Sequence, residues 1–245
     1  MERGMNERIR KLRKQSLETE PHIYMERANL ETDAYMLYEG SVSIPELRAL
    51  SFKYFMEHKT LCINDGELIV GEKGDGPQAA PSFPELCCHT VEDMKIMNAR
   101  DLIYFRVTEE DLKLQEEKII PFWEKRSVRH KILANMTEEW KNAYAAGIFT
   151  EFMEQRGPGH TVGSEKIYKK GFLDYKNDII EARNNLDFLN DKEAFDKKSQ
   201  LNAMEICCDA IIILGERYAA YARELAAKET DETRKAELLQ IAENC

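Results

Sequence analysis

The stretch that decides the fold is Met204-Glu-Ile-Cys-Cys-Asp-Ala-Ile-Ile-Ile-Leu-Gly-Glu-Arg-Tyr218, near the end of the sequence. Its apolar side chains recur at helical spacing and form one wide apolar face, so a single long helix is predicted over residues 192–227. Cys207 and Cys208 both fall on this face. We therefore expect them to be core residues rather than reactive thiols.

Most of the remaining chain also shows helical patterns. Thr90 is followed three residues later by Asp93, which is typical of a capped helix N-terminus. Helices are expected over residues 6–18, 26–38, 45–58, 90–98, 108–118, 121–136, 137–146, 164–185 and 232–244. The apolar run at residues 67–71 is bounded by a glycine and predicts a short strand. Because glycine and proline are concentrated in residues 66–84 and 147–171, we expect irregular segments there and a mainly α chain.

Composition excludes several classes of protein. The 245 residues contain 35 Lys and Arg against 45 Asp and Glu, a net charge of −10, which disfavours non-specific binding to nucleic acid. The hydrophobic share of 43% is too high for a disordered chain. No apolar run approaches the roughly 18 residues of a membrane span. A chain of this size does not need disulfides, so we expect its six cysteines to be reduced thiols in the cytoplasm.

Two segments carry candidate chemistry. Cys87-Cys88-His89 suggests a metal ligand set or a nucleophile, but the sequence shows no second ligand cluster, so no metal site is predicted and the role stays open. The segment Phe149-Thr-Glu-Phe-Met-Glu-Gln-Arg-Gly-Pro-Gly-His-Thr-Val162 presents His160 on a Gly-Pro-Gly bend. An imidazole titrates near neutrality and can hydrogen-bond a substrate hydroxyl. From the residues alone, a surface or structurally bonded histidine is the alternative.

Three segments also carry a resemblance to a known family. They are Asn64-Asp-Gly-Glu-Leu-Ile-Val-Gly-Glu-Lys-Gly74, Pro84-Glu-Leu-Cys-Cys-His-Thr90 and Glu151-Phe-Met-Glu-Gln-Arg-Gly-Pro-Gly-His-Thr161. Through them the chain resembles the N-terminal part of glycyl radical enzymes of the pyruvate formate-lyase family, over essentially all of its length. The last two segments resemble most the members that dehydrate trans-4-hydroxy-L-proline. The resemblance implies a ten-stranded α/β barrel wrapped by helices. Residues 1–245 would be its truncated N-terminal part, without a separate second domain.

The resemblance further implies radical chemistry that these residues cannot complete. The family uses a glycyl radical near the C-terminus and a thiyl radical on a mid-chain cysteine, and neither motif occurs in this sequence. The complete enzyme would be a cytoplasmic homodimer from an anaerobe, without a directly bound cofactor. A radical SAM activating enzyme would install its radical. It would convert hydroxyproline to 1-pyrroline-5-carboxylate and water, whereas residues 1–245 alone are expected to be inactive. Neither nucleic acid nor membrane is an expected partner.

The resemblance assigns roles to two residues. Phe152 is expected to pack on the pyrrolidine ring of the substrate. His160 is expected to contact the substrate near the departing hydroxyl and to act as the catalytic acid that helps water to leave. A positioned acid of this kind contributes typically ~10²–10⁴-fold. Formate-lyases of the family use a vicinal cysteine pair, but the flanks of Cys87-Cys88 do not match that site, so its role is not transferred.

Two other interpretations remain open at the level of sequence. The chain could belong to another member of the family, such as a formate acetyltransferase, a glycerol dehydratase or an aryl decarboxylase. It could also be a free-standing helical module that binds the rest of a radical enzyme. In that case the apolar stripe at residues 238–241, which ends without a helix stop signal, would be its interface.

Overall fold

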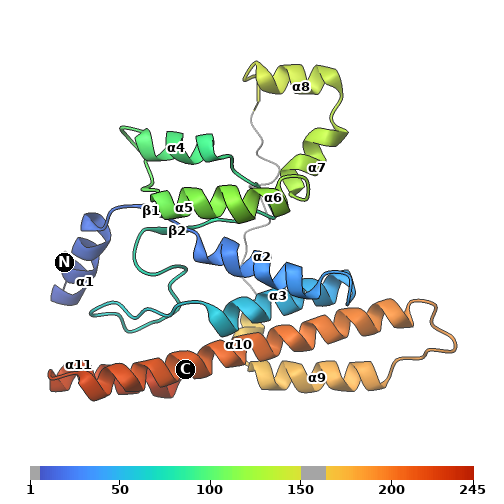
Figure 1. Cartoon of the computed structure of the whole chain (residues 1–245). Coiled ribbons are helices and arrows are strands. Elements are labelled where there is room, and N and C mark those ends of the chain that lie inside the picture. The colour runs from blue at the N-terminus through green and yellow to red at the C-terminus, as the bar shows by residue number, and fades with distance from the viewer. Residues whose placement is uncertain (1–5, 150–163) are drawn as a thin grey trace.

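The long helix predicted from the C-terminal stretch is the element against which most of the lower helices pack. In the computed structural model, which describes residues 6–149 and 164–245, this helix is α10, Ala194–Lys228 (Figure 1). The other helices are α1 (Glu7–Glu18), α2 (Glu26–Tyr38), α3 (Ile44–His58), α4 (Val91–Ala99), α5 (Glu109–Leu114), α6 (Ile120–Trp123), α7 (Val128–Asn135), α8 (Glu138–Ala145), α9 (Phe172–Asn184) and α11 (Glu232–Asn244). The prediction of a mainly α chain is confirmed. Within the described ranges no helix is both long and apolar enough to cross a membrane.

Three helices cover the apolar face of α10. Helices α3, α9 and α11 pack against it, and α2 lies on the far side of α3 (Figure 1). Against α11 the contact is made by a cluster of small and aliphatic residues, namely Ala222, Ala226, Leu238, Ile241 and Ala242. Cys208 is buried and Cys207 is half-buried, and burial raises the pKa of both thiols. The expectation of a core position is therefore confirmed for Cys208, whereas Cys207 is only partly covered and lines the groove between α3, α9 and α10.

A second hydrophobic core attaches α4 and the α5–α6 region to α2. Its buried members are Met25, Ala28, Met94, Ile119 and Trp123. The indole Nε1 of Trp123 donates a hydrogen bond to the hydroxyl of Thr32 at 2.8 Å, so the polar atom of this buried ring is satisfied. This core joins α4 and the α5–α6 region to α2, whereas α7 and α8 extend beyond it (Figure 1).

The strand prediction at residues 67–71 is wrong. The strands among the described residues are β1 (His22–Tyr24) and β2 (Ala79–Pro81), which pair in parallel. In residues 64–67 the carboxylate of Glu67 accepts hydrogen bonds from the backbone and side-chain amides of Asn64, and Gly66 has φ +86°. These contacts close a tight turn. The apolar run after the turn pairs with no strand among the described residues, and Ile69 within it is 90% exposed.

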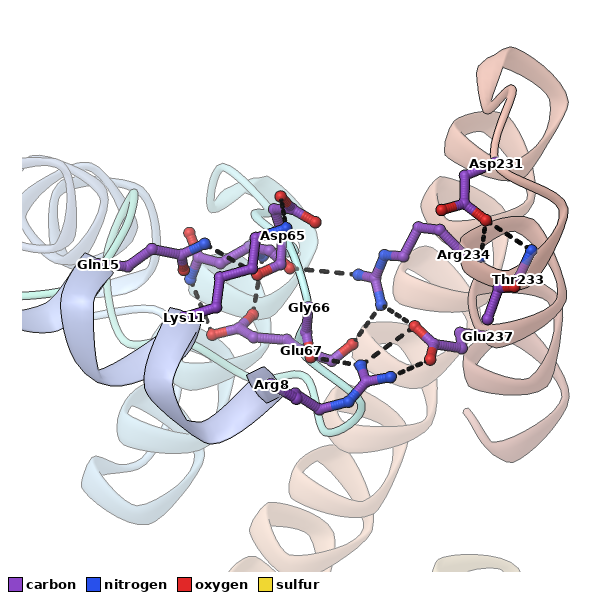
Figure 2. A network of polar contacts seen from close by, with 11 residues as sticks. Arg8, Lys11, Gln15, Asp65, Gly66, Glu67, Asp231, Thr233, Arg234 and Glu237 are labelled. Carbon is purple, nitrogen blue, oxygen red and sulfur yellow. Dashed lines mark hydrogen bonds and ion pairs between the residues drawn. The ribbon is translucent and has the colours of Figure 1, made fainter. Parts of the chain in front are cut away.

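Two arginines donate hydrogen bonds to the backbone carbonyl oxygens of this turn (Figure 2). Arg234 of α11 donates to the carbonyls of Glu67 at 2.7 Å and Asn64 at 3.2 Å. Arg8 of α1 donates to the carbonyl of Gly66 at 2.8 Å, and both arginines bind the carboxylate of Glu237. The turn thus fixes the first and last described helices to each other.

The predicted helix over residues 121–136 is also divided differently. The chain is helical from α5 through the π-helical turn η1 (Gln115–Ile119) to α6, and a separate helix, α7, begins after Ser127. Pro121 lacks an N–H and its ring crowds the carbonyl four residues earlier, which a wider π turn accommodates. The helix expected over residues 164–185 begins instead as a 3₁₀ turn, η2 (Ser164–Tyr168). It is interrupted at Gly171, whose N–H is capped by Asp174 at 2.9 Å.

Candidate functional site

The two residues predicted for the substrate pocket, Phe152 and His160, lie outside the described residues. The nearest described residues are Phe149, three positions before Phe152 and just after α8, and Ser164, four positions after His160. Gly147, with φ +73°, ends α8, and the ring of Phe149 lies against those of Trp140 and Tyr144 at centroid distances of 5.1 and 5.8 Å. The chain that leads into the candidate segment is therefore folded back onto α8.

Arg129 links α8 to the Cys87-Cys88-His89 segment. Its Nη2 donates to the hydroxyl of Tyr144 at 2.7 Å, and its Nη1 donates to the Sγ of Cys87 at 3.7 Å. Both contacts are partly buried. A guanidinium has a planar fork of donors and can therefore bind two partners at once.

The chain around Cys87 is held from two sides. From α7, the N–H groups of Val128 and Arg129 donate to the carbonyls of Glu85 at 2.9 Å and Leu86 at 3.0 Å. From the π turn, the buried Gln115 donates from Nε2 to the carbonyl of His89 at 2.6 Å. Backbone groups outside regular structure are thus paired, which keeps this loop in one conformation.

An ion pair fixes the start of the same loop. Arg27 of α2 binds the carboxylate of Glu85 through two nitrogens, at 2.6 and 3.1 Å, and its guanidinium lies 3.9 Å from the centre of the Phe83 ring. Such a bidentate pair is geometrically specific. Beside it Glu31 is buried, and burial raises the pKa of its carboxyl group.

The chemistry available to the vicinal cysteines is limited by burial. Burial, with smaller contributions from Cys87 and Glu124, raises the pKa of Cys88 to about 12, so its thiol is protonated at neutral pH. Since the thiolate is the nucleophilic form, burial disfavours a nucleophilic role for Cys88 in this environment. In the ranges that the structure describes, no three His, Cys, Asp or Glu side chains form a group that could hold a metal ion.

A cavity of about 320 Å³ adjoins this loop. Its walls are mainly apolar and include the side chains of Ile23, Phe83, Leu86, Met94 and Met97, with Cys87 and His89. A cavity of this size could hold a small organic molecule. Sequence analysis did not identify Arg129, Tyr144 and Gln115 as residues that hold this loop. Their hydrogen-bond partners lie 15 to 42 residues away in the chain, so no local pattern indicates these contacts.

Comparison with known proteins gives concordant matches. A family model described as pyruvate formate lyase-like matches residues 5–245. A trans-4-hydroxy-L-proline dehydratase of Clostridioides difficile is 61% identical over 245 residues, which are 100% of this chain and 31% of the relative.

Two solved structures are similar in fold. The crystal structure of the hydroxyproline dehydratase of Clostridioides difficile, with trans-4-hydroxy-L-proline bound, superposes with a TM-score of 0.93 at 61% identity and covers 100% of this chain and 31% of that one. The glycerol-bound B12-independent glycerol dehydratase of Clostridium butyricum gives a TM-score of 0.89 at 30% identity, with 99% and 31% covered. The chain therefore spans less than a third of the length of the proteins it matches.

Proposed function

Because the chain belongs to the pyruvate formate lyase-like family, we propose that it is part of a glycyl radical enzyme that removes water from trans-4-hydroxy-L-proline and forms 1-pyrroline-5-carboxylate. The observation that carries this proposal is the 61% identity to a hydroxyproline dehydratase across all 245 residues. Residues 1–245 would then be one part of the catalytic domain, without a separate second domain. The match to a glycerol dehydratase is more distant, at 30% identity.

In the proposed reaction the protein radical supplies hydrogen abstraction, and residues of this chain handle the substrate. Phe152 would pack on the pyrrolidine ring and hold it in place. His160 would donate a hydrogen bond or a proton to the hydroxyl oxygen as the carbon–oxygen bond breaks, so that the hydroxyl leaves as water. The activating partner would be a radical SAM enzyme, and the complete protein would act as a homodimer in the cytoplasm.

The proposal is tested with the full-length protein, activated under anaerobic conditions. We expect 1-pyrroline-5-carboxylate to form from trans-4-hydroxy-L-proline, with no comparable product from glycerol or isethionate. Absence of turnover, despite a glycyl radical signal in electron paramagnetic resonance, would refute the substrate assignment.

The role of His160 is tested separately. The substitution His160→Ala should lower the rate of dehydration by about 10²-fold or more, because the departing hydroxyl loses its acid, while the radical signal stays unchanged. His58→Ala is the control, since His58 lies exposed on α3 and stacks on Tyr54. Wild-type turnover in the His160→Ala protein would remove this residue from the site.

A further inference from the structure

A cavity of about 290 Å³ lies where α2 and α3 pack together, beside the segment that follows β2 (Figure 1). Two arginines, two glutamates, three phenylalanines and a methionine line it. Arg48 and Phe83 are exposed whereas Glu31 is buried, so the cavity leads from the surface inward. Its volume is close to the lower end of the range for cavities that hold small ligands.

Two of the four charged side chains already bind each other. Arg27 holds the carboxylate of Glu85 through two nitrogens, at 2.6 and 3.1 Å, and its guanidinium covers the ring of Phe83. Arg27 also donates to the carbonyl of Ser82 at 3.2 Å. This pair is therefore part of the wall of the cavity and needs no ligand.

The other two charged side chains, Glu31 and Arg48, have no such close ion pair. Glu31 is 9% exposed, yet its one ion pair among the described residues is with Nη2 of Arg27 at 4.0 Å. Burial raises the pKa of this carboxyl group, and the positive charges of Arg27 and Arg48 only partly oppose the rise. In the part of the chain that the structure describes, the Arg48 guanidinium forms neither an ion pair nor a hydrogen bond. The cavity thus presents one acidic and one basic group that lie near each other without pairing.

We propose that this cavity binds a small zwitterion, an α-amino acid with an apolar side chain. Arg48 takes the carboxylate of the ligand, which matches the planar fork of a guanidinium, and Glu31 takes the ammonium group. The apolar side chain lies against Phe52 and Phe55. A lone cation or a lone anion would pair only one of the two groups, whereas a zwitterion pairs both and adds no net charge to the cavity. The inference does not depend on the reaction that the full-length protein catalyses.

The ligand class is tested by isothermal titration calorimetry on the full-length protein without activation. The probe is L-valine, and the matched ligands are isovalerate, which lacks the ammonium group, and isobutylamine, which lacks the carboxylate. We expect L-valine to bind at least tenfold more tightly than either, because each of the others leaves one charge of the cavity unpaired. Equal affinity for L-valine and isovalerate would overturn the proposal, as would the absence of L-valine binding at millimolar concentration.

Two variants assign the binding to this cavity. Arg48→Gln and Glu31→Gln each remove one charge and should each raise the Kd for L-valine at least tenfold. Lys53→Gln is the matched control, since Lys53 lies on the same helix as Arg48, pairs with Glu57 and does not line the cavity. Because Arg48 is exposed, its variant keeps the test valid even where Glu31→Gln fails to fold. Unchanged affinity in Arg48→Gln would show that L-valine binds elsewhere and would refute the site.

Discussion

Cys88 shows how strongly burial controls a single side chain. With a pKa of about 12, only about one thiol in ten thousand is ionised at pH 8. In the folded protein we therefore expect iodoacetamide at pH 8 to alkylate Cys88 at least a hundredfold more slowly than in the same protein unfolded in urea. Tandem mass spectrometry measures both rates at the residue. Equal rates in the two states would show that the thiol is exposed and reactive.

His22 provides a pH-dependent contact. Burial acts to lower the pKa of His22, but the hydrogen bond and charge of Asp75, 2.8 Å from its Nε2, outweigh burial, so the pKa is raised. The folded state then holds this proton more tightly than the unfolded state. The resulting stabilisation is complete below the unfolded pKa of about 6.5 and is lost as pH rises through the folded value.

The substitution Asp75→Asn should reveal this dependence. We expect it to reduce the free energy of unfolding by about 0.5 kcal/mol at pH 5.5 and by close to nothing at pH 9, because the pair is partly exposed. Thermal unfolding at the two pH values, at low salt, provides the measurement. An equal effect at both would mean that the proton on His22 plays no part.

At the scale of elements, Gly74 allows the loop that precedes β2 to pack closely against Tyr24 of β1 and Ala79 of β2. A methyl group there would clash with the Cβ of Ala79 and lie 3.2 Å from the Tyr24 ring, whereas one at Gly76 would meet no atom within 4 Å. Gly74→Ala should therefore destabilise the protein by about 1–3 kcal/mol and Gly76→Ala by much less. Hydrogen exchange at residues 22–24 and 79–81 reports the difference. Equal protection in both variants would contradict this packing.

The docking of α11 depends on Arg234, whose side chain is only 11% exposed. Arg234→Ala leaves the carbonyls of Asn64 and Glu67 without this donor, which should cost about 2–3 kcal/mol and increase hydrogen exchange in α11. Lys235→Ala is the control, because Lys235 is half-exposed and, among the described residues, its side chain pairs only with Glu232, at 3.7 Å. The prediction fails if both variants exchange alike.

Helices were predictable where the sequence contains a capping motif or a helical repeat of apolar residues. Thr90 and Asp93 form the capping box that their spacing predicts, and α10 follows its apolar periodicity. The structure of residues 67–71 was not predictable, because arginines from α1 and α11 bind the carbonyls of Gly66 and Glu67 at its start and, among the described residues, no neighbouring strand pairs with it. Short-range patterns determine helices, whereas strands and turns depend on what distant residues supply.

At the scale of the whole molecule, apolar surface is exposed along α3, α9 and α10. A groove of about 890 Å³, lined in part by Ile44 of α3, lies between them. Ile44 is 75% exposed, Phe195 near the start of α10 is 74% exposed, and Leu189 in the connection between α9 and α10 is 94% exposed. When residues 1–245 are expressed alone, we expect self-association and binding of a hydrophobic dye. Replacing Leu189 and Phe195 by Glu should reduce both. A monodisperse species that binds no dye in size-exclusion chromatography would instead favour a free-standing module.

The roles given to Phe152 and His160 rest only on a family resemblance and stay predictions, because both residues lie outside the described ranges. Phe152 and His160 follow from matching segments, whereas nothing in the sequence near Arg129 indicates its contacts. Its partners Tyr144 and Cys87 lie 15 and 42 residues away, and only the packing of α7, α8 and the loop brings them together. Pairings of this kind depend on tertiary structure and leave no local pattern.

The π turn at Gln115–Ile119 has a consequence for how this region can change its length. In an α-helix each residue advances the chain by about 100°, so inserting one residue after the π turn and before Trp123 would rotate Trp123 by that amount relative to Gln115. Trp123 would swing away from Thr32, and Gln115 and Trp123 could no longer both keep their buried partners. We therefore expect natural variants of this protein to tolerate insertions between α2 and α3, but to gain no residue between Ile119 and Trp123.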